Sequence, residues 1–374
     1  MRHRTSLLVM ILILLQIRCG NNTETYTAET INGVKHIHNI APLWGDEQRI
    51  SLEFVQKIGE LESEDENYNL YHPWHTAFDD SGNIYILEYS LGGNIKKFDP
   101  SGKYLATIGK KGQGPGEFEG PAAFDVDKNG NIYVLQQHTG KVQILSPEGK
   151  YIKNIYIPQR SSEIRLLSSG NIVFVKHVSY SNNKTESSIC GIADSDGNIL
   201  NEFCEPEEIN KDSFLGSENS VTLDVDKDDN IFISFNNQNR IEKYSSEGKK
   251  IFKMDRELYY DLNSEEVTDE YIVRDTKVEI PTVRFTPVSK SISIDHKGRI
   301  WDYFIKKQFD DNYNKENYNN YVEFRIYDND GIFVTKVPFI RDKTLPRGRF
   351  FNDKMYVNEG SVNMCVYVFR VLEK

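Results

Sequence analysis

The acidic residues most suited to chemistry lie around residue 127. Asp125, Asp127 and Asn129, followed by Gly130, repeat the first half of a calcium-binding loop. The twelfth position of such a loop is Gln136 rather than the bidentate Glu that calcium usually requires. Since Asp, Asn and Gly are also the residues that tight turns prefer, the pattern predicts a β-turn and not a metal site.

Histidines and catalytic motifs give equally little support for an enzyme. His36 and His38 form one pair and His72 and His75 another, and neither has a third ligand at zinc spacing. The chain lacks the G-x-S-x-G, H-E-x-x-H and Walker patterns. We therefore predict no catalytic residue, no cofactor-binding residue and no metal ligand, and the interpretation leans against an enzyme without excluding a divalent metal.

A more interesting set of residues stands at the ends of predicted strands, at equivalent points of an internal repeat. Two carboxylates, one amide, one ammonium group and two aromatic rings would hold a metal ion, a sugar or a peptide end if the fold gathered them. The alternative is a solvated tunnel whose polar groups are satisfied. The candidates are Glu88, Gln136, Lys176, Phe235, Phe304 and Glu359.

Two turn signals recur along the chain and define the elements that position these residues. The first is Ser81-Gly82-Asn83 before Ile84-Tyr85-Ile86, which returns in six copies, the last two degenerate. The second is Ser101-Gly102-Lys103, with counterparts after each of the first five copies. Alternating strands on both sides of each turn give a unit of four short antiparallel strands. Such units repeated every ~40–70 residues predict an all-β, six-bladed β-propeller.

The two ends of the propeller region provide an independent check. The sixth copy supplies strands near Arg349–Phe351, Met355–Asn358 and Cys365–Leu372, one strand short of a blade. Ile50–Ile58 precedes the first copy without a neighbour to pair with. We therefore predict that this N-terminal strand completes the last blade and closes the ring, which removes exposed strand edges.

A resemblance to a known family rests on the second blade. Residues 112–118, with the sequence Gly-Gln-Gly-Pro-Gly-Glu-Phe, and then Pro121 and residues 129–134 resemble the NHL-repeat consensus. The apolar run Leu7 to Leu15, followed by Cys19, resembles a bacterial lipobox. With this start, the chain resembles the bacterial six-bladed β-propeller lipoproteins. The motif departs from NHL where an Asp usually ends it, because Glu88 and Gln136 stand there. The resemblance implies a fold and a location in the cell envelope, but it does not imply a ligand.

The N-terminus has the residue pattern of an export signal. Two arginines precede nine apolar residues, Leu7 to Leu15, a run too short for a membrane span. Cys19 follows at the position of a lipobox cysteine, although Arg18 and Gln16 are unusual there. We predict a signal peptide at 1–18, lipid attachment at Cys19, a lipid-proximal tether at 19–45 and the propeller at 46–374. The alternatives are ordinary cleavage nearby and an uncleaved anchor. The sequence does not indicate whether the anchor lies in the inner or the outer membrane, or in which leaflet.

Loop lengths indicate which face carries function. Long insertions follow only second or fourth strands, which places them on one face of the ring. Within one of them, residues 265–275 are predicted as a short helix. Trp44 and Trp74, with neighbouring Tyr and His residues, form a candidate aromatic cluster. The insertions are residues 176–188, 205–220, 255–287 and 306–321.

Charge and cysteine content complete the prediction. The formal charge of −11 and the lack of a basic run argue against nucleic acid as a partner. Cys190, Cys204 and Cys365 are too few for a disulfide framework, although Cys190 and Cys204 are candidates for a pair. We predict a non-catalytic binding module of the cell envelope that recognises an envelope protein, peptide or glycan and meets the membrane only through its lipid. The alternative is a lactonase-like, metal-dependent hydrolase or lyase at the channel mouth.

Overall fold

The protein is represented by a computed structural model. It describes residues 24–89, 93–136, 138–176, 188–207, 219–273, 276–310, 312–313, 317–338, 347–360 and 363–374. The predicted signal peptide and Cys19 lie outside these residues. Among the residues described, no helix has the length and apolar character needed to cross a membrane.

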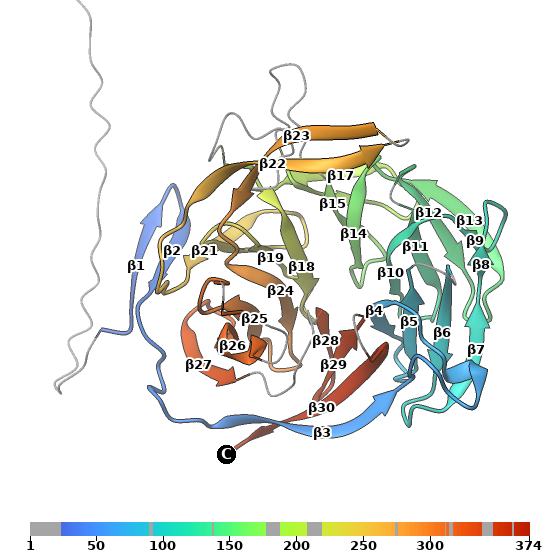
Figure 1. The fold of residues 1–374 in the computed structure, drawn as a ribbon, viewed down its shortest axis with the longest axis horizontal. Helices are drawn as coiled ribbons and strands as arrows, with labels where there is room; N and C mark the ends of the chain where they lie inside the picture. Colours follow the sequence, from blue (N-terminus) through green and yellow to red (C-terminus); the bar gives the residue numbers. More distant parts are fainter. Residues whose placement is uncertain are drawn as a thin grey trace, which may run out of the picture.

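The described strands form six antiparallel sheets of four propeller strands each, arranged around a central axis (Figure 1). This confirms the six-bladed β-propeller. The first three blades are, in order, β4 (Pro73–Phe78), β5 (Ile84–Glu88), β6 (Asn94–Phe98) and β7 (Tyr104–Ile108); β10 (Pro121–Val126), β11 (Ile132–Gln136), β12 (Lys141–Leu145) and β13 (Tyr151–Tyr156); and β14 (Ser161–Leu166), β15 (Ile172–Lys176), β16 (Cys190–Ala193) and β17 (Ile199–Phe203).

The next two blades follow the same order from the axis outward. They are β18 (Val221–Val225), β19 (Ile231–Phe235), β20 (Ile241–Tyr244) and β21 (Lys250–Asp255), and then β24 (Ser289–Ile294), β25 (Ile300–Ile305), β26 (Val322–Tyr327) and β27 (Phe333–Pro338). The predicted insertions follow second and fourth strands of these blades, namely β15, β17, β21 and β25. A short parallel pair, β8 (Lys110–Lys111) and β9 (Glu117–Phe118), joins the first blade to the second.

The last blade combines both ends of the propeller region. It contains β28 (Arg347–Phe351), β29 (Lys354–Glu359), β30 (Cys365–Glu373) and, as its outer strand, β3 (Ile50–Ile58). The antiparallel pairing of β3 with β30 runs from Ile50 opposite Glu373 to Ile58 opposite Val366. The predicted closing strand is therefore confirmed.

Turn chemistry sets the spacing of the strands, as the repeat indicates. The Asp127 carboxylate accepts the backbone N–H groups of Asn129 and Asn131, both at 2.8 Å. Gly130 adopts φ of 81°, a left-handed conformation that costs glycine little. The calcium-like pattern is thus a β-turn between β10 and β11.

Part of the predicted tether is ordered. β1 (Tyr26–Ile31) and β2 (Val34–Asn39) form a hairpin, and β2 pairs in parallel with β21 at the outer edge of the fourth blade. The hairpin extends this blade to six strands (Figure 1). Alternation of Val34, His36 and His38 with their neighbours suits a strand, but the pairing partner lies more than 200 positions away.

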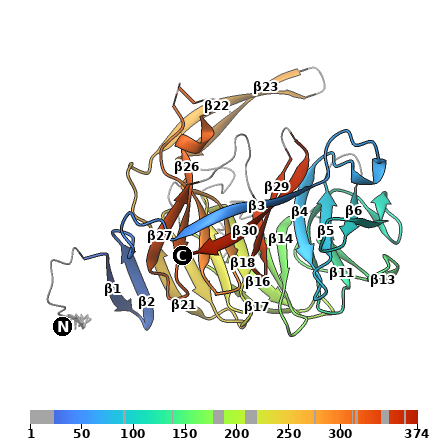
Figure 2. The same ribbon diagram turned by 90° about the horizontal axis from the view of Figure 1, so that it is seen from below.

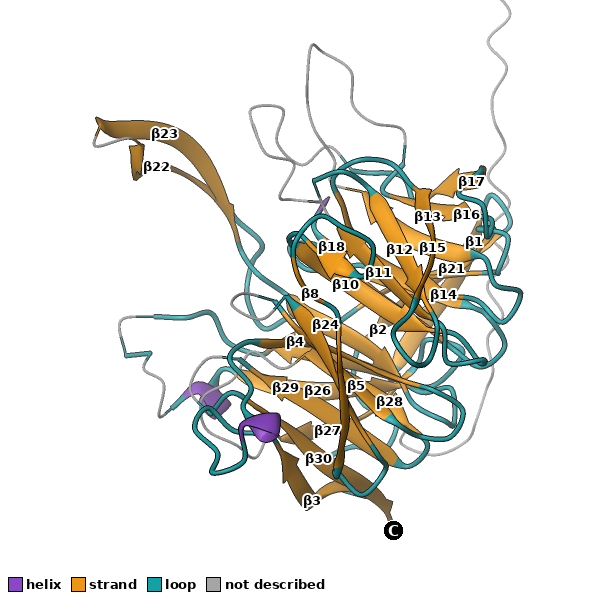
Figure 3. Cartoon of the chain, turned by 90° about the vertical axis from the view of Figure 1, so that its right-hand side faces the viewer, coloured by secondary structure: helices purple, strands orange, loops and turns teal. Residues whose placement is uncertain are grey.

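The predicted short helix at residues 265–275 is wrong. β22 (Ser264–Val273) and β23 (Thr276–Phe285) form a two-stranded arm instead, with Val273 opposite Thr276 at its turn. Figures 2 and 3 show the arm leaving the body of the ring. Since Val, Thr, Tyr and Ile favour strands, their frequency here outweighs the charged residues that suggested a helix. The described helices are two short 3₁₀ turns, η1 (Glu66–Tyr68) and η3 (Tyr318–Asn320).

The core lies between adjacent blades rather than in one central mass. Tyr85 and Leu87 of the first blade, for example, pack with Phe124 and Val134 of the second. Cys190, Cys204 and Cys365 are buried free thiols. Burial raises the pKa of the Cys190 thiol, as does the adjacent Cys204.

Candidate functional site

Ion pairs link residues of the innermost strands around the central channel. Arg349 Nη1 of β28 lies 2.7 Å from Asp125 Oδ1 of β10. In the neighbouring blade, Arg165 of β14 pairs with Glu163 at 3.1 Å and with Asp224 of β18 at 3.3 Å. Burial alone would raise the pKa of the Asp125 carboxyl, but the Arg349 guanidinium more than offsets it and the pKa is lowered.

Two aspartates at equivalent positions also join neighbouring blades. The second carboxylate oxygen of Asp125 accepts the backbone N–H of Leu166 at 3.0 Å. In the same way, Asp224 accepts the N–H of Ile294 at 2.9 Å. These carboxylates therefore hold the ring together at its centre, because each is bonded to both an arginine and a backbone group.

This donor set does not fit a divalent cation. Every channel carboxylate named above already faces a guanidinium group, which would repel a metal ion. No group of three or more His, Cys, Asp or Glu side chains in the described residues is placed to hold a metal. One pocket in the channel, beside His75, Arg165 and Arg349, has a volume of about 30 Å³. That is room for about one or two water molecules.

Three of the six predicted site residues hold the loops of their own blades. Glu88 Oε2 accepts the backbone N–H groups of Tyr71 and His72 at 2.7 and 3.0 Å. Burial raises the pKa of Glu88. Glu359 accepts the N–H of Asn363, and Lys176 pairs with Glu202 at 2.6 Å.

The other three are buried as well. Gln136 is 3% exposed, and its amide Nε2 has no hydrogen-bond partner among the residues described. The rings of Phe235 and Phe304 are each covered by a guanidinium, from Arg240 and Arg325, at 3.5 Å from the ring centre. None of the six lines the space in the channel. The fold places them at equivalent strand ends, but does not gather them into one site.

The predicted aromatic cluster is split in two. Trp74 lies 5.6 Å from His72 and 5.4 Å from Tyr89, between ring centres, near the first blade. Trp44 instead packs against the core between the last two blades, with Arg49 over its ring.

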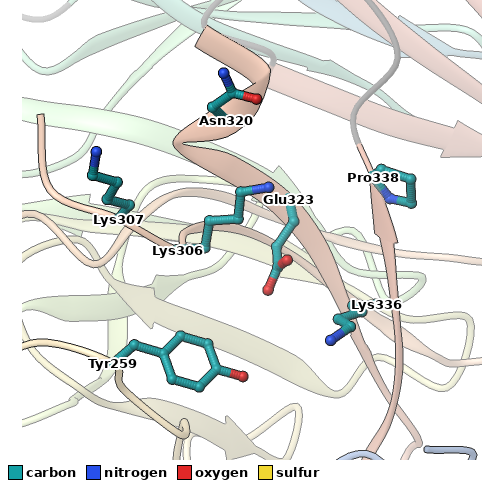
Figure 4. Close-up of a pocket in the computed structure, with 7 residues that line it drawn as sticks. All are labelled: Tyr259, Lys306, Lys307, Asn320, Glu323, Lys336 and Pro338. Atoms are coloured by element: carbon teal, nitrogen blue, oxygen red, sulfur yellow. The ribbon is translucent and has the colours of Figure 1, made fainter. Parts of the chain in front are cut away.

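A hollow lies on the fifth blade, at the insertion-bearing face. Its volume is about 560 Å³ (Figure 4). Three lysines, one glutamate, one asparagine, one tyrosine and one proline line it. They are Tyr259, Lys306, Lys307, Asn320, Glu323, Lys336 and Pro338.

Several elements bring these side chains together. The backbone N–H of Lys306 donates to the Tyr321 carbonyl at 2.8 Å, which fixes the end of β25 against the start of β26. Glu323 and Lys336 come from the paired strands β26 and β27. Tyr259 comes from the insertion after β21 and is 58% exposed. Figure 4 shows these groups around one open space.

The hollow is locally cationic on an acidic protein. Lys307 pairs with Asp310 at 2.7 Å and Lys336 with the exposed Asp46 at 3.4 Å. Its hydrogen bond to Asp310 raises the pKa of Lys307, and the same bond lowers the pKa of Asp310 to about 2. The Lys306 ammonium has no carboxylate within ion-pair distance among the described side chains.

A buried arginine supports the back of the hollow. Arg325 is fully buried and its Nε donates to Glu323 Oε1 at 3.0 Å. Its guanidinium lies between the Phe304 ring, at 3.5 Å, and the Tyr259 ring, at 5.3 Å. Phe304, a predicted site residue, therefore contacts the hollow only through Arg325.

Sequence reasoning identified part of this site. The sequence predicts an insertion at residues 306–321 on the loop-bearing face, but it does not connect this insertion to Tyr259 or Lys336. Phe309 and Tyr321 do stack in this insertion, with ring centres 5.4 Å apart. The feature of the sequence that could have indicated this hollow is the pair of adjacent lysines at 306 and 307, at the end of a predicted strand.

Comparisons with known proteins agree with the fold. Residues 60–237 match a family model described as "Domain of unknown function (DUF4934)". The chain matches none of the curated proteins. A DUF4221 family member from Bacteroides vulgatus has a similar structure, with a TM-score of 0.57 and 12% identity, over 87% of this chain and 99% of that chain.

Two further structures are similar. A putative exported protein from Bacteroides fragilis has a TM-score of 0.57 and 14% identity, over 87% of this chain and 96% of the other. Virginiamycin B lyase from Staphylococcus aureus has a TM-score of 0.49 and 13% identity, over 87% and 100% of the two chains. At these identities the first two matches establish the fold alone, and the TM-score of the third is too low for any inference.

The protein is thus a six-bladed β-propeller with ion pairs between its inner strands and a basic hollow on its loop-bearing face. Nearly half of it, residues 60–237, matches a domain whose function is unknown.

Proposed function

We propose that this protein is a non-catalytic binding module whose ligand occupies the hollow on the fifth blade. The observation that supports this is the volume of the hollow, about 560 Å³, against about 30 Å³ for the channel pocket beside His75, Arg165 and Arg349. Binding pockets for small molecules generally fall between ~300 and 1,000 Å³. A rigid scaffold that presents ligand-binding loops is a common use of such a face.

The alternative, a metal-dependent hydrolase or lyase in the channel, has less support. Such an enzyme needs carboxylates that are free to bind a cation and space for a substrate. Here Asp125, Glu163 and Asp224 are paired with Arg349 and Arg165. The predicted partners, an envelope protein, a peptide or a glycan, remain the candidates for the hollow.

A fluorescent reporter at the hollow tests this function. Asn320→Cys places a thiol on its lining, and the native described cysteines are buried, so an environment-sensitive dye labels this position selectively. Cys19→Ser in the same chain prevents labelling or lipidation there. The labelled protein is screened against neutral and acidic glycans and envelope peptides, with Lys227→Cys, in the 226–229 turn, as control.

We expect at least one compound to change the emission of the Asn320 label, to leave the control label unchanged, and to be recovered chemically intact by mass spectrometry. A panel that affects neither label, or a compound that is recovered cleaved, would contradict a binding module at this hollow.

We also propose that the chain is exported and anchored by a lipid on Cys19. The support is the short basic and apolar N-terminal pattern, together with the fold shared with the putative exported protein from Bacteroides fragilis. Cys19→Ser should move the protein from the membrane fraction to the soluble fraction and abolish incorporation of a labelled fatty acid. An unchanged distribution would show that membrane association does not depend on this thiol.

A further inference from the structure

We infer that the hollow on the fifth blade recognises an acidic oligosaccharide that contains uronic acid residues. This inference rests on the proposed function, since it names the class of ligand for the same site. It depends on the chemical mixture of the lining, because Lys306, Glu323 and Tyr259 each suit a different part of such a sugar.

The lysines of the hollow would bind the negatively charged carboxylates of the ligand. Lys306, Lys307 and Lys336 line a single hollow in a protein whose formal charge is −11. Two of these lysines pair with the carboxylates of Asp310 and Asp46, which are on the surface. A sugar carboxylate has the same chemistry, so it can replace Asp46 on Lys336 or bind the ammonium of Lys306, which has no ion-pair partner among the described residues.

The hydrogen-bond acceptors in the hollow would bind the hydroxyl groups of the ligand. Glu323 lines the hollow and receives Arg325 Nε on Oε1, which fixes the side chain; a carboxylate can accept further hydrogen bonds. Asn320 adds an amide that both donates and accepts hydrogen bonds. Vicinal hydroxyls of a sugar are donors that suit these acceptors.

The aromatic side chain provides a flat surface. Tyr259 is 58% exposed, and its hydroxyl donates to Glu257 Oε2 at 2.8 Å, which restrains the ring. The guanidinium of buried Arg325 lies 5.3 Å from the ring centre on the protein side. An exposed ring held in this way offers an apolar platform beside polar groups, as an amphipathic sugar ring requires.

Titration calorimetry with the full chain carrying Cys19→Ser tests the inference. The probes are trigalacturonate, trimannuronate and a hyaluronan tetrasaccharide, each compared with a neutral oligosaccharide of the same length. We expect one acidic probe to bind with one-to-one stoichiometry and at least tenfold more tightly than its neutral counterpart. Lys306→Glu should weaken this binding at least tenfold, the effect of losing about 1.4 kcal/mol.

Lys227→Glu is the matched control, because it makes the same charge change at an exposed side chain in the 226–229 turn. It should leave the affinity within twofold, and both variants should keep the unfolding midpoint of the parent. Equal loss in both variants would show a general charge effect and overturn the inference, as would a failure of all three acidic probes to bind at 1 mM.

The proposed function and this inference fail differently. Neutral oligosaccharides or peptides that change the Asn320 reporter, with no preference for the acidic probes, would overturn the inference and leave the binding function standing. If no compound changes the reporter, both fail.

Discussion

The Nδ1 atom of His38 lies 2.6 Å from the carboxylate of Asp255 and so joins the N-terminal hairpin to the outer strand of the fourth blade. The two residues are opposite each other in the parallel pairing of β2 with β21. Glu29 of β1 lies 3.5 Å from the other ring nitrogen. Both carboxylates favour the protonated imidazole.

Docking of the hairpin should therefore depend on pH. The hydrogen bond to Asp255 raises the pKa of His38 above its ordinary value, although burial opposes this. A raised histidine pKa means that the stabilisation is fully present below about pH 6.5 and is lost as pH rises through the raised value. Hydrogen exchange of residues 34–39, corrected for the intrinsic rate, should show less protection at pH 8.5 than at pH 6.

His38→Gln should remove this decrease. His36, on the same strand, is the control, because burial lowers its pKa and its contribution has the opposite sign. His36→Gln should therefore keep the loss of protection at high pH. A His38→Gln protein with the parent's pH profile would contradict the role assigned to this contact.

The buried ion pair between the fourth and fifth blades should be important for stability. Arg256 Nε lies 2.6 Å from Asp302 Oδ2, and both side chains are fully buried. Asp302→Asn leaves the arginine without a counter-charge, which typically costs about 3–5 kcal/mol in the free energy of unfolding. Urea denaturation should show this loss.

Two comparisons make the result specific. Asp228→Asn removes an exposed partner of Lys227 and should cost under about 1 kcal/mol. The double variant Arg256→Met with Asp302→Leu should be more stable than Asp302→Asn alone, because it buries no unpaired charge. A double variant that is less stable than the single one would contradict this explanation.

Ring closure should be equally sensitive to the closing strand. Ile58 is 1% exposed and packs with Tyr356 and Val366 in the last blade. Ile58→Ala should lower the free energy of unfolding by about 2–5 kcal/mol. Glu53→Ala, an exposed change on the same strand, should cost under about 1 kcal/mol. Similar unfolding midpoints for the two variants would show that β3 does not stabilise the ring.

Metal removal should have no effect on the unfolding temperature. The channel carboxylates of Asp125 and Asp224 already bind arginines, so calcium, zinc, manganese or magnesium has no free ligand set there. Differential scanning calorimetry after EDTA treatment, and again with each ion restored, is the measurement. An ion at ~100 times its dissociation constant would add ~2.7 kcal/mol, so a rise with one ion only would support the channel enzyme instead.

The ring could be predicted from the sequence because its signals are local. Residues such as Asp127 and Gly130 specify a turn through contacts within five positions, and the repeat multiplies this signal. The closing strand Ile50–Ile58 followed from counting strands. These features need no knowledge of distant contacts.

The site could not be predicted in the same way because it is made of distant contacts. Tyr259 and Lys336 meet in the hollow only because the fourth and fifth blades are neighbours. Arg349 reaches Asp125 across 224 positions. Equivalent strand ends, such as Glu88 and Phe304, share a place in the repeat, but each is buried against its own surroundings.

The division of the last blade between distant segments has a consequence for biogenesis. Glu53 and Arg370 contact each other across 317 positions, so β3 is synthesised long before its partner. Contacts of such long sequence separation form slowly, and until they do the sixth blade presents an open edge. A truncated or stalled product would keep that edge exposed to proteases. Only a chain that includes β30 can pair with β3 and cover this edge.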